Sequence, residues 1–163
     1  MTSSVRVAIR RAVLVAAVVW LALSVAIVLS NVVFPRRQAD DSVAVVVSYL
    51  AVFVSLLVTG RLAAEVTADR RTQALAGAVA GALVGSFTAG TFFAVDNIFL
   101  STVALQQTKI DGFAESGMTS MRAYLNAGLI GPLVFWTLAF AVIGAALAVV
   151  GGAAARPSET LAR

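Results

Sequence analysis

Residues 72–95 read TQALAGAVAGALVGSFTAGTFFAV, which are 24 residues without a formal charge between Arg71 and Asp96. A helix rises about 1.5 Å per residue, so about 20 apolar residues cross a hydrocarbon core about 30 Å thick. Three other uncharged stretches have similar or greater lengths: 24 residues in 12–35, 19 in 42–60 and 33 in 123–155. The sequence therefore predicts an all-α integral membrane protein with four spans.

The composition supports this class. Hydrophobic residues make up 60% of the chain and charged residues 12%, whereas soluble domains contain about 25% charged residues. Cysteine and histidine are both absent, which removes thiol chemistry, disulfides and the usual zinc ligands. We therefore expect a single membrane domain over residues 1–163, with no metal, no cofactor and no enzymatic activity.

The span limits follow from the charges and the helix-breaking residues. Short connections place consecutive helices side by side, so we expect an antiparallel four-helix transmembrane bundle. Proline is best tolerated in the first turn of a helix, which favours a fourth span that begins near Pro132. The expected spans are about 12–34, 42–60, 73–95 and 132–152, with short cytoplasmic tails at 1–11 and 153–163.

The basic residues gather at the span ends. With the N-terminus in the cytoplasm, eight Arg residues lie on the inner side and four basic residues on the outer side, which favours two cytoplasmic termini. Lipid headgroups are the simplest counter-charge for such a belt, so we expect membrane lipids and no nucleic acid as partners. The prevalence of Ala, Val and Arg favours a bacterial inner (cytoplasmic) membrane.

Small residues recur every four positions in the third span. Residues at this spacing share a helix face, and close packing across small side chains is a main source of helix association in lipid. The strip receives either the chain's own helices or a partner, which is a second copy or another membrane protein. Four helices in one chain need an interior to pack around, which favours packing against the chain's own helices. The expected packing residues, which we call the small-residue strip with its counterpart on the fourth span, are Gly77, Gly81, Gly85, Ala89 and Gly90, with Gly144 and Ala148.

Asp96 is the carboxylate attached directly to a span. At the C-terminal end of a helix its charge opposes the helix dipole, so it needs water or a cation nearby. One interpretation is a solvated or paired interfacial residue. The other is a proton or cation site in an outer vestibule, formed by Asp96, Asn97, Asn31, Arg36, Arg37, Arg122 and Asn126.

The connections carry three further predictions. Asp69 is expected to cap the third helix, and Glu65 is expected to pair with Arg61 at i, i+4 spacing. The helical spacing of apolar residues predicts a short interfacial helix over about 112–126 between the third and fourth spans. This helix either lies in the outer interface or covers the mouth of the bundle as a lid.

Two functions are compatible with these features. The first is a small non-catalytic inner-membrane protein that acts as a helix-packing subunit or scaffold. The second is a small transporter or channel component that uses the polar vestibule around Asp96. No charged residue stands in the middle of a span, which disfavours an exchanger that depends on a mid-membrane carboxylate.

Overall fold

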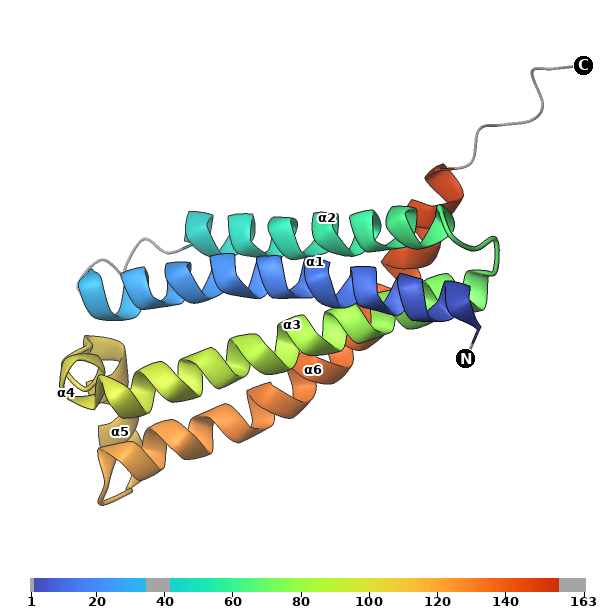
Figure 1. Cartoon of the computed structure of the whole chain (residues 1–163). Coiled ribbons are helices and arrows are strands. Elements are labelled where there is room, and N and C mark those ends of the chain that lie inside the picture. Colours follow the sequence, from blue (N-terminus) through green and yellow to red (C-terminus); the bar gives the residue numbers. More distant parts are fainter. Residues whose placement is uncertain (1, 35–41, 156–163) are drawn as a thin grey trace, which may run out of the picture.

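The computed structural model describes residues 2–34 and 42–155, and all regular secondary structure in this part is helical (Figure 1). Four helices are long and apolar enough to cross a membrane, which confirms the all-helical class and the four candidate spans. They are α1 (Ser3–Val28, continued by the π-helical η1, Leu29–Val33), α2 (Ser42–Ala64), α3 (Arg70–Ile98) and α6 (Met121–Ala154). Two short helices, α4 (Leu100–Val103) and α5 (Gln107–Ser116), lie between α3 and α6.

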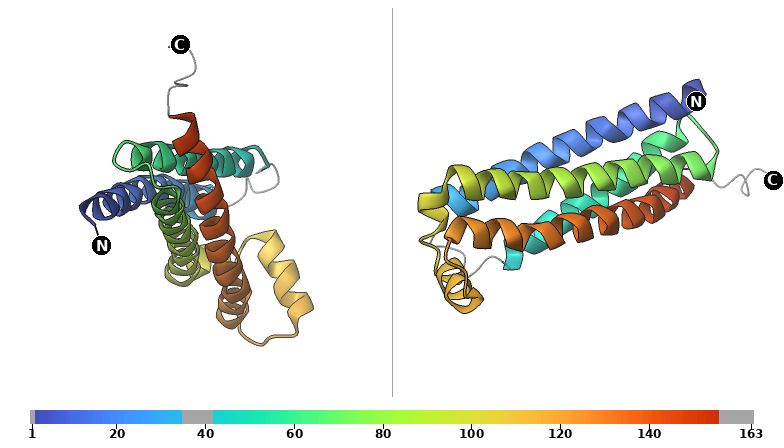
Figure 2. Two further views of the ribbon diagram at one scale, coloured as in Figure 1. Left: turned by 90° about the vertical axis from the view of Figure 1, so that its right-hand side faces the viewer. Right: turned by 90° about the horizontal axis from the view of Figure 1, so that it is seen from below.

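The four long helices pack in pairs. α3 and α6 lie side by side and make the most extensive contact, while α2 packs mainly on α6 and α1 mainly on α3 (Figures 1 and 2). The beginning of α1 and the end of α6 lie at the same end of the molecule. The opposite end, which carries α4 and α5, is called the α5 end below.

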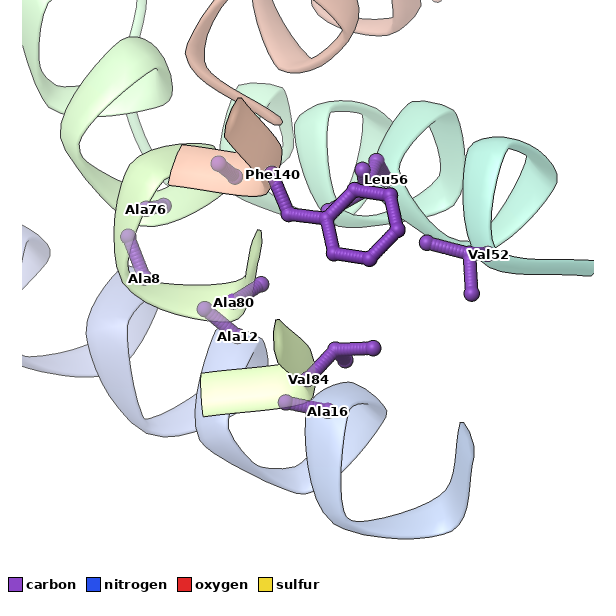
Figure 3. Close-up of a cluster of buried hydrophobic side chains, with 10 residues drawn as sticks. Ala8, Ala12, Ala16, Val52, Leu56, Ala76, Ala80, Val84 and Phe140 are labelled. Carbon is purple, nitrogen blue, oxygen red and sulfur yellow. The ribbon is translucent and has the colours of Figure 1, made fainter. Parts of the chain in front are cut away.

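The core consists mostly of small side chains. Ala8, Ala12 and Ala16 of α1 are each no more than 1% exposed and point toward α3 (Figure 3). Opposite them on α3 are Ala76, Ala80 and Val84, and α2 and α6 contribute Val52, Leu56 and Phe140. Because methyl groups fill so little space, the first half of α1 approaches α3 closely. These alanines of α1 were not among the expected packing residues.

This packing explains why α1 begins before the expected limit. The helix begins at Ser3, within the segment 1–11 that is expected to be a cytoplasmic tail. Ala8 is buried, so the helix has to extend through this position to reach α3. The helix can include Arg6, Arg10 and Arg11, because arginine is a good helix former.

The start of α3 is as expected, whereas the ion pair beside it is not. Asp69 is the N-cap, and its carboxylate accepts hydrogen bonds from the backbone N–H groups of Arg71 and Thr72, both at 3.1 Å. Glu65 pairs with Arg11 at 2.6 Å and not with Arg61. Arg11 also donates to the carbonyl of Leu62 at 2.8 Å. A partner on α1 thus replaces the local i, i+4 partner.

The predicted interfacial helix over 112–126 is wrong in its limits. The helix here is α5, and it ends at Ser116 because Gly117 adopts a left-handed conformation with φ of 66°. This is the usual glycine C-cap. Ser120 then caps a new helix, since its hydroxyl accepts from the backbone N–H of Ala123 at 3.4 Å. Residues 121–126 therefore belong to α6.

Because Ser120 caps α6, the fourth helix does not begin near Pro132, where the sequence predicts its start. It begins at Met121 and includes Pro132 in its interior. A proline removes the hydrogen bond to the carbonyl four residues earlier and crowds it. That residue is Gly128, and proline is better tolerated in membrane helices than in soluble ones.

Candidate functional site

The small-residue strip of α3 faces α6 in this structure. A Cβ atom at Gly77 would collide with the carbonyl oxygen of Gly144, and one at Gly81 with the carbonyl oxygen of Phe140. At Gly85 it would come within 2.8 Å of the carbonyl oxygen of Trp136. These backbone contacts on three successive turns are called the α3–α6 seam. Ala148 extends it, because its Cβ lies against Gly77.

A second close approach joins α2 to α6. A side chain at Gly60 of α2 would collide with the backbone of Ala148, and one at Gly151 of α6 with the backbone of Leu57. Neither glycine was among the expected packing residues. Gly60 is the last residue of the uncharged stretch of the second span, where a glycine is typical of a helix boundary. Helix α6 therefore has close backbone neighbours on two sides.

The α5 half of the strip is not covered by α6. Gly90 has no atom within 4 Å of the position of a Cβ, and it lines a shallow hollow between α1 and α3. Ala89 lines a cavity at the centre of the four helices. The expected packing residues thus divide into a contacting set and two positions beside open space.

The residues of the expected vestibule do not all lie together in the structure. Asn97 of α3 donates to the side-chain carbonyl of Asn126 of α6 at 2.7 Å, and this bond joins the two helices at the α5 end. Arg122 is exposed. Arg36 and Arg37 lie outside the described residues.

Asp96 is buried and faces a cation from another element. Its side chain is 2% exposed, and Oδ2 lies 3.9 Å from Nζ of Lys109 in α5, which is 32% exposed. This distance exceeds that of a hydrogen bond. Within the part of the chain that the structure describes, Oδ2 accepts no hydrogen bond. A buried carboxylate with such incomplete pairing is costly in stability and is often associated with function.

Asn31 joins η1 to the segment before α5. Its side-chain amide donates to the carbonyl of Ile27 at 2.9 Å, and Gln106, which is 3% exposed, donates to the backbone carbonyl of Asn31 at 3.2 Å. Oε1 of Gln106 is buried and has no hydrogen-bond donor among the described residues. Asn31, Asp96, Gln106 and Lys109 thus lie at one end of the molecule, where α3, η1 and α5 end or begin.

Sequence reasoning missed Gln106 and Lys109. A signal was present for the second of these, because Lys109 is the single lysine among twelve basic residues. A lysine so near Asp96 in the sequence is a plausible counter-charge. Nothing in the local pattern around Gln106 distinguishes it from the neighbouring Gln107, which binds Asp111 on the surface at 2.7 Å.

Trp20 connects α1 to the same half of α3. Its indole N–H donates to the hydroxyl of Thr91 at 2.9 Å, and its ring lies 5.4 Å from that of Phe87. The hydroxyls of Ser24 and Thr91 lie 3.0 Å apart. Trp20 thus packs between α1 and α3.

An apolar cavity of about 270 Å³ lies among α1, α2, α3 and α6, in the half of the molecule nearer the α5 end. One wall is aromatic: Tyr49 of α2 lies 5.6 Å from Trp136 and 6.2 Å from Phe140, measured between ring centroids. The remaining lining is aliphatic or small, with a few hydroxyl groups. Such a cavity is suited to an apolar guest.

The described residues contain no group of three or more carboxylates placed to hold a metal ion. Comparison with known protein families, with curated proteins and with solved structures finds no match.

Proposed function

We propose that this chain is a small non-catalytic protein of the bacterial inner membrane, a helix-packing subunit or scaffold. In this proposal the four long helices cross the bilayer as an antiparallel bundle, with α5 in the outer interface. Both termini are cytoplasmic, because eight of the twelve basic residues then lie on the inner side. Membrane lipids surround the protein in this proposal.

The observation that carries the proposal of a partner is the exposed apolar face of α1, because the α3–α6 seam lies within the chain. The glycines of the seam bring two backbones into contact over three turns, and such contacts hold the chain's own helices together in lipid without a hydrophobic driving force. Since α6 already occupies the strip, a partner helix would bind elsewhere. Large apolar side chains on the outside of α1 provide such a face, with a spacing of three and four residues: Leu14, Val18, Leu21 and Val25, each 55–69% exposed.

Copurification in a mild detergent followed by mass spectrometry tests the scaffold proposal. We expect a stoichiometric partner, either a second copy or another membrane protein, with the unmodified chain. We expect Leu14→Ala combined with Leu21→Ala to release it. The matched control is Leu138→Ala on α6, whose side chain is 62% exposed on another helix. The proposal fails if the unmodified chain is recovered alone, or if the control releases the partner equally.

A second candidate is a small transporter or channel component, and the burial of Asp96 favours it. Ionisable groups buried in membrane helices often mark ion or substrate paths, and Asp96 has only a loose contact with Lys109. Asp96→Asn should then change the flux or the ion dependence of reconstituted vesicles. The same flux with and without the carboxylate would rule this candidate out.

A further inference from the structure

The central cavity exists because small residues meet on several helices. Ala26 of α1, Ala44 of α2 and Ala89 of α3 line it, together with Gly85. Protein interiors are packed to the density of organic crystals and contain few voids larger than a water molecule. A cavity of about 270 Å³ is therefore unlike the packed core around Leu56 and Val84.

The cavity is elongated along the helices and opens on one side. Its lining on α2 extends from Ala44 to Val52, and eight residues correspond to about 12 Å of helix. Ala26, Ala44 and Val45 are exposed and form its rim, whereas Val52, Gly85 and Phe140 are buried and close its inner end. A narrow, unbranched guest that lies parallel to the helices fits this shape.

The chemistry of the lining favours hydrocarbon over water. Ser30 and Ser48 donate their hydroxyl protons to carbonyls of their own helices, those of Ile27 and Ala44. The hydroxyl of Thr88 is buried and has no partner among the described residues, but one hydroxyl alone does not hold a water. A stable buried water needs two to four polar partners, and apolar cavities stay dry.

We propose that the cavity binds the hydrocarbon chain of a membrane lipid. All the helices that line it are candidate membrane spans, and the rim continues into the exposed apolar surface of α2 at Val46 and Val47. Bilayer lipid therefore has direct access to the rim. The inference rests on the proposed membrane location and is independent of the scaffold role.

Photocrosslinking tests the occupant. The protein is reconstituted in vesicles of phosphatidylethanolamine and phosphatidylglycerol that contain phosphatidylglycerol with a diazirine in its acyl chain. We expect crosslinks on residues of the inner cavity wall, such as Thr88 and Val52, in addition to the outer helix faces. Ala89→Phe, which fills the cavity, should abolish the inner crosslinks and leave the outer ones.

The matched control is Ala51→Phe on α2, because Ala51 is exposed and does not line the cavity. This variant should keep the inner crosslinks. The inference is overturned if the inner wall remains unlabelled in the unmodified protein, or if Ala89→Phe leaves its labelling unchanged. A chain that is not recovered with the vesicles would contradict the membrane location itself, which is a separate result.

A second measurement does not depend on the folding of Ala89→Phe. Because the chain has no cysteine, Thr88→Cys introduces a single thiol into the cavity wall. We expect this thiol to react with neither a membrane-soluble nor a charged, water-soluble maleimide, because the thiolate is the nucleophile and a dry apolar cavity suppresses its formation. Ser116→Cys, at the exposed end of α5, should react with both. Reaction of Thr88→Cys with the charged reagent would show a water-filled cavity and overturn the inference.

Discussion

Gly77 of α3 and Gly144 of α6 exclude side chains from each other. The carbonyl oxygen of each residue occupies the place that a Cβ atom on the other would need. Neither position tolerates alanine unless the helices separate. Since dispersion forces decay steeply with distance, separation would weaken every contact along the seam.

The α2–α6 contact makes a direct prediction about stability. Gly60→Ala and Gly151→Ala each place a methyl group on a backbone carbonyl of the neighbouring helix. We expect each to lower the free energy of unfolding by about 1–3 kcal/mol, the usual cost of overpacking. Gly128→Ala is the control, because open space surrounds it, and it should gain about 0.5–1 kcal/mol from helix propensity. Denaturant titration in detergent micelles measures all three, and an equal response would contradict the packing.

The bond between Trp20 and Thr91 should hold α1 to α3. Thr91→Val removes the acceptor of the 2.9 Å hydrogen bond, and we expect a loss of about 0.6–1.7 kcal/mol, as for other hydrogen bonds between membrane helices. The emission of Trp20 should shift as the indole loses its partner. Thr91→Ser keeps a hydroxyl and should preserve both properties. If valine and serine behave alike, the hydrogen bond does not contribute.

Loss of the cation beside Asp96 should be costly. Lys109→Met leaves a carboxylate that is 2% exposed without its counter-charge, and we expect a destabilisation of about 1–3 kcal/mol. Arg122→Met, at an exposed position of α6, should change little. Adding Asp96→Asn to Lys109→Met should restore part of the lost stability. Thermal unfolding of the unmodified protein, the two single variants, the double variant and the Arg122→Met control checks this, and additive effects of the two substitutions would show that the two groups do not interact.

The cap of α3 should depend on pH. The hydroxyl of Thr72, and then the backbone N–H groups of Arg71 and Thr72, bond to the carboxylate and lower the pKa of Asp69. A carboxylate with a lowered pKa in the folded protein stabilises it fully above the ordinary pKa of about 3.9. This contribution is lost as the pH falls through the lower, folded-state pKa.

We therefore expect Asp69→Ala to lower the stability at neutral pH and to reduce its dependence on pH in the acid range. Thermal unfolding between neutral and strongly acidic pH measures both effects. Asp69→Asn keeps a side chain that can cap the helix but cannot ionise, so it separates capping from charge. If Asp69→Ala retains the full acid dependence, other carboxylates are responsible.

Much of the helix-packing pattern could be predicted from local spacing. Gly77, Gly81 and Gly85 recur every four residues, which places them on one face of α3 whatever the partner. The same argument applies to Ala8, Ala12 and Ala16, but three alanines in an apolar helix are a weaker signal than three glycines. The identity of the facing helix follows from tertiary packing, and the sequence left it open between the chain itself and a partner.

The polar contacts between distant segments were less accessible to sequence reasoning. Glu65 has Arg61 at an ideal helical spacing, yet it pairs with Arg11, which is 54 residues away. Gln106 binds a backbone carbonyl 75 residues earlier, and such a bond has no signature in side-chain patterns. Local periodicity determines which face a residue lies on, whereas contacts between distant segments depend on how the helices cross.

The most direct test of the α3–α6 seam is a comparison of two identical substitutions on α3. Gly81→Leu places a large side chain against the backbone of α6, whereas Gly90→Leu places it where nothing lies within 4 Å. Thermal unfolding in the same detergent should show a large loss of stability for Gly81→Leu and none for Gly90→Leu. Unchanged unfolding temperatures for both variants, or an equal loss for both, would contradict the seam.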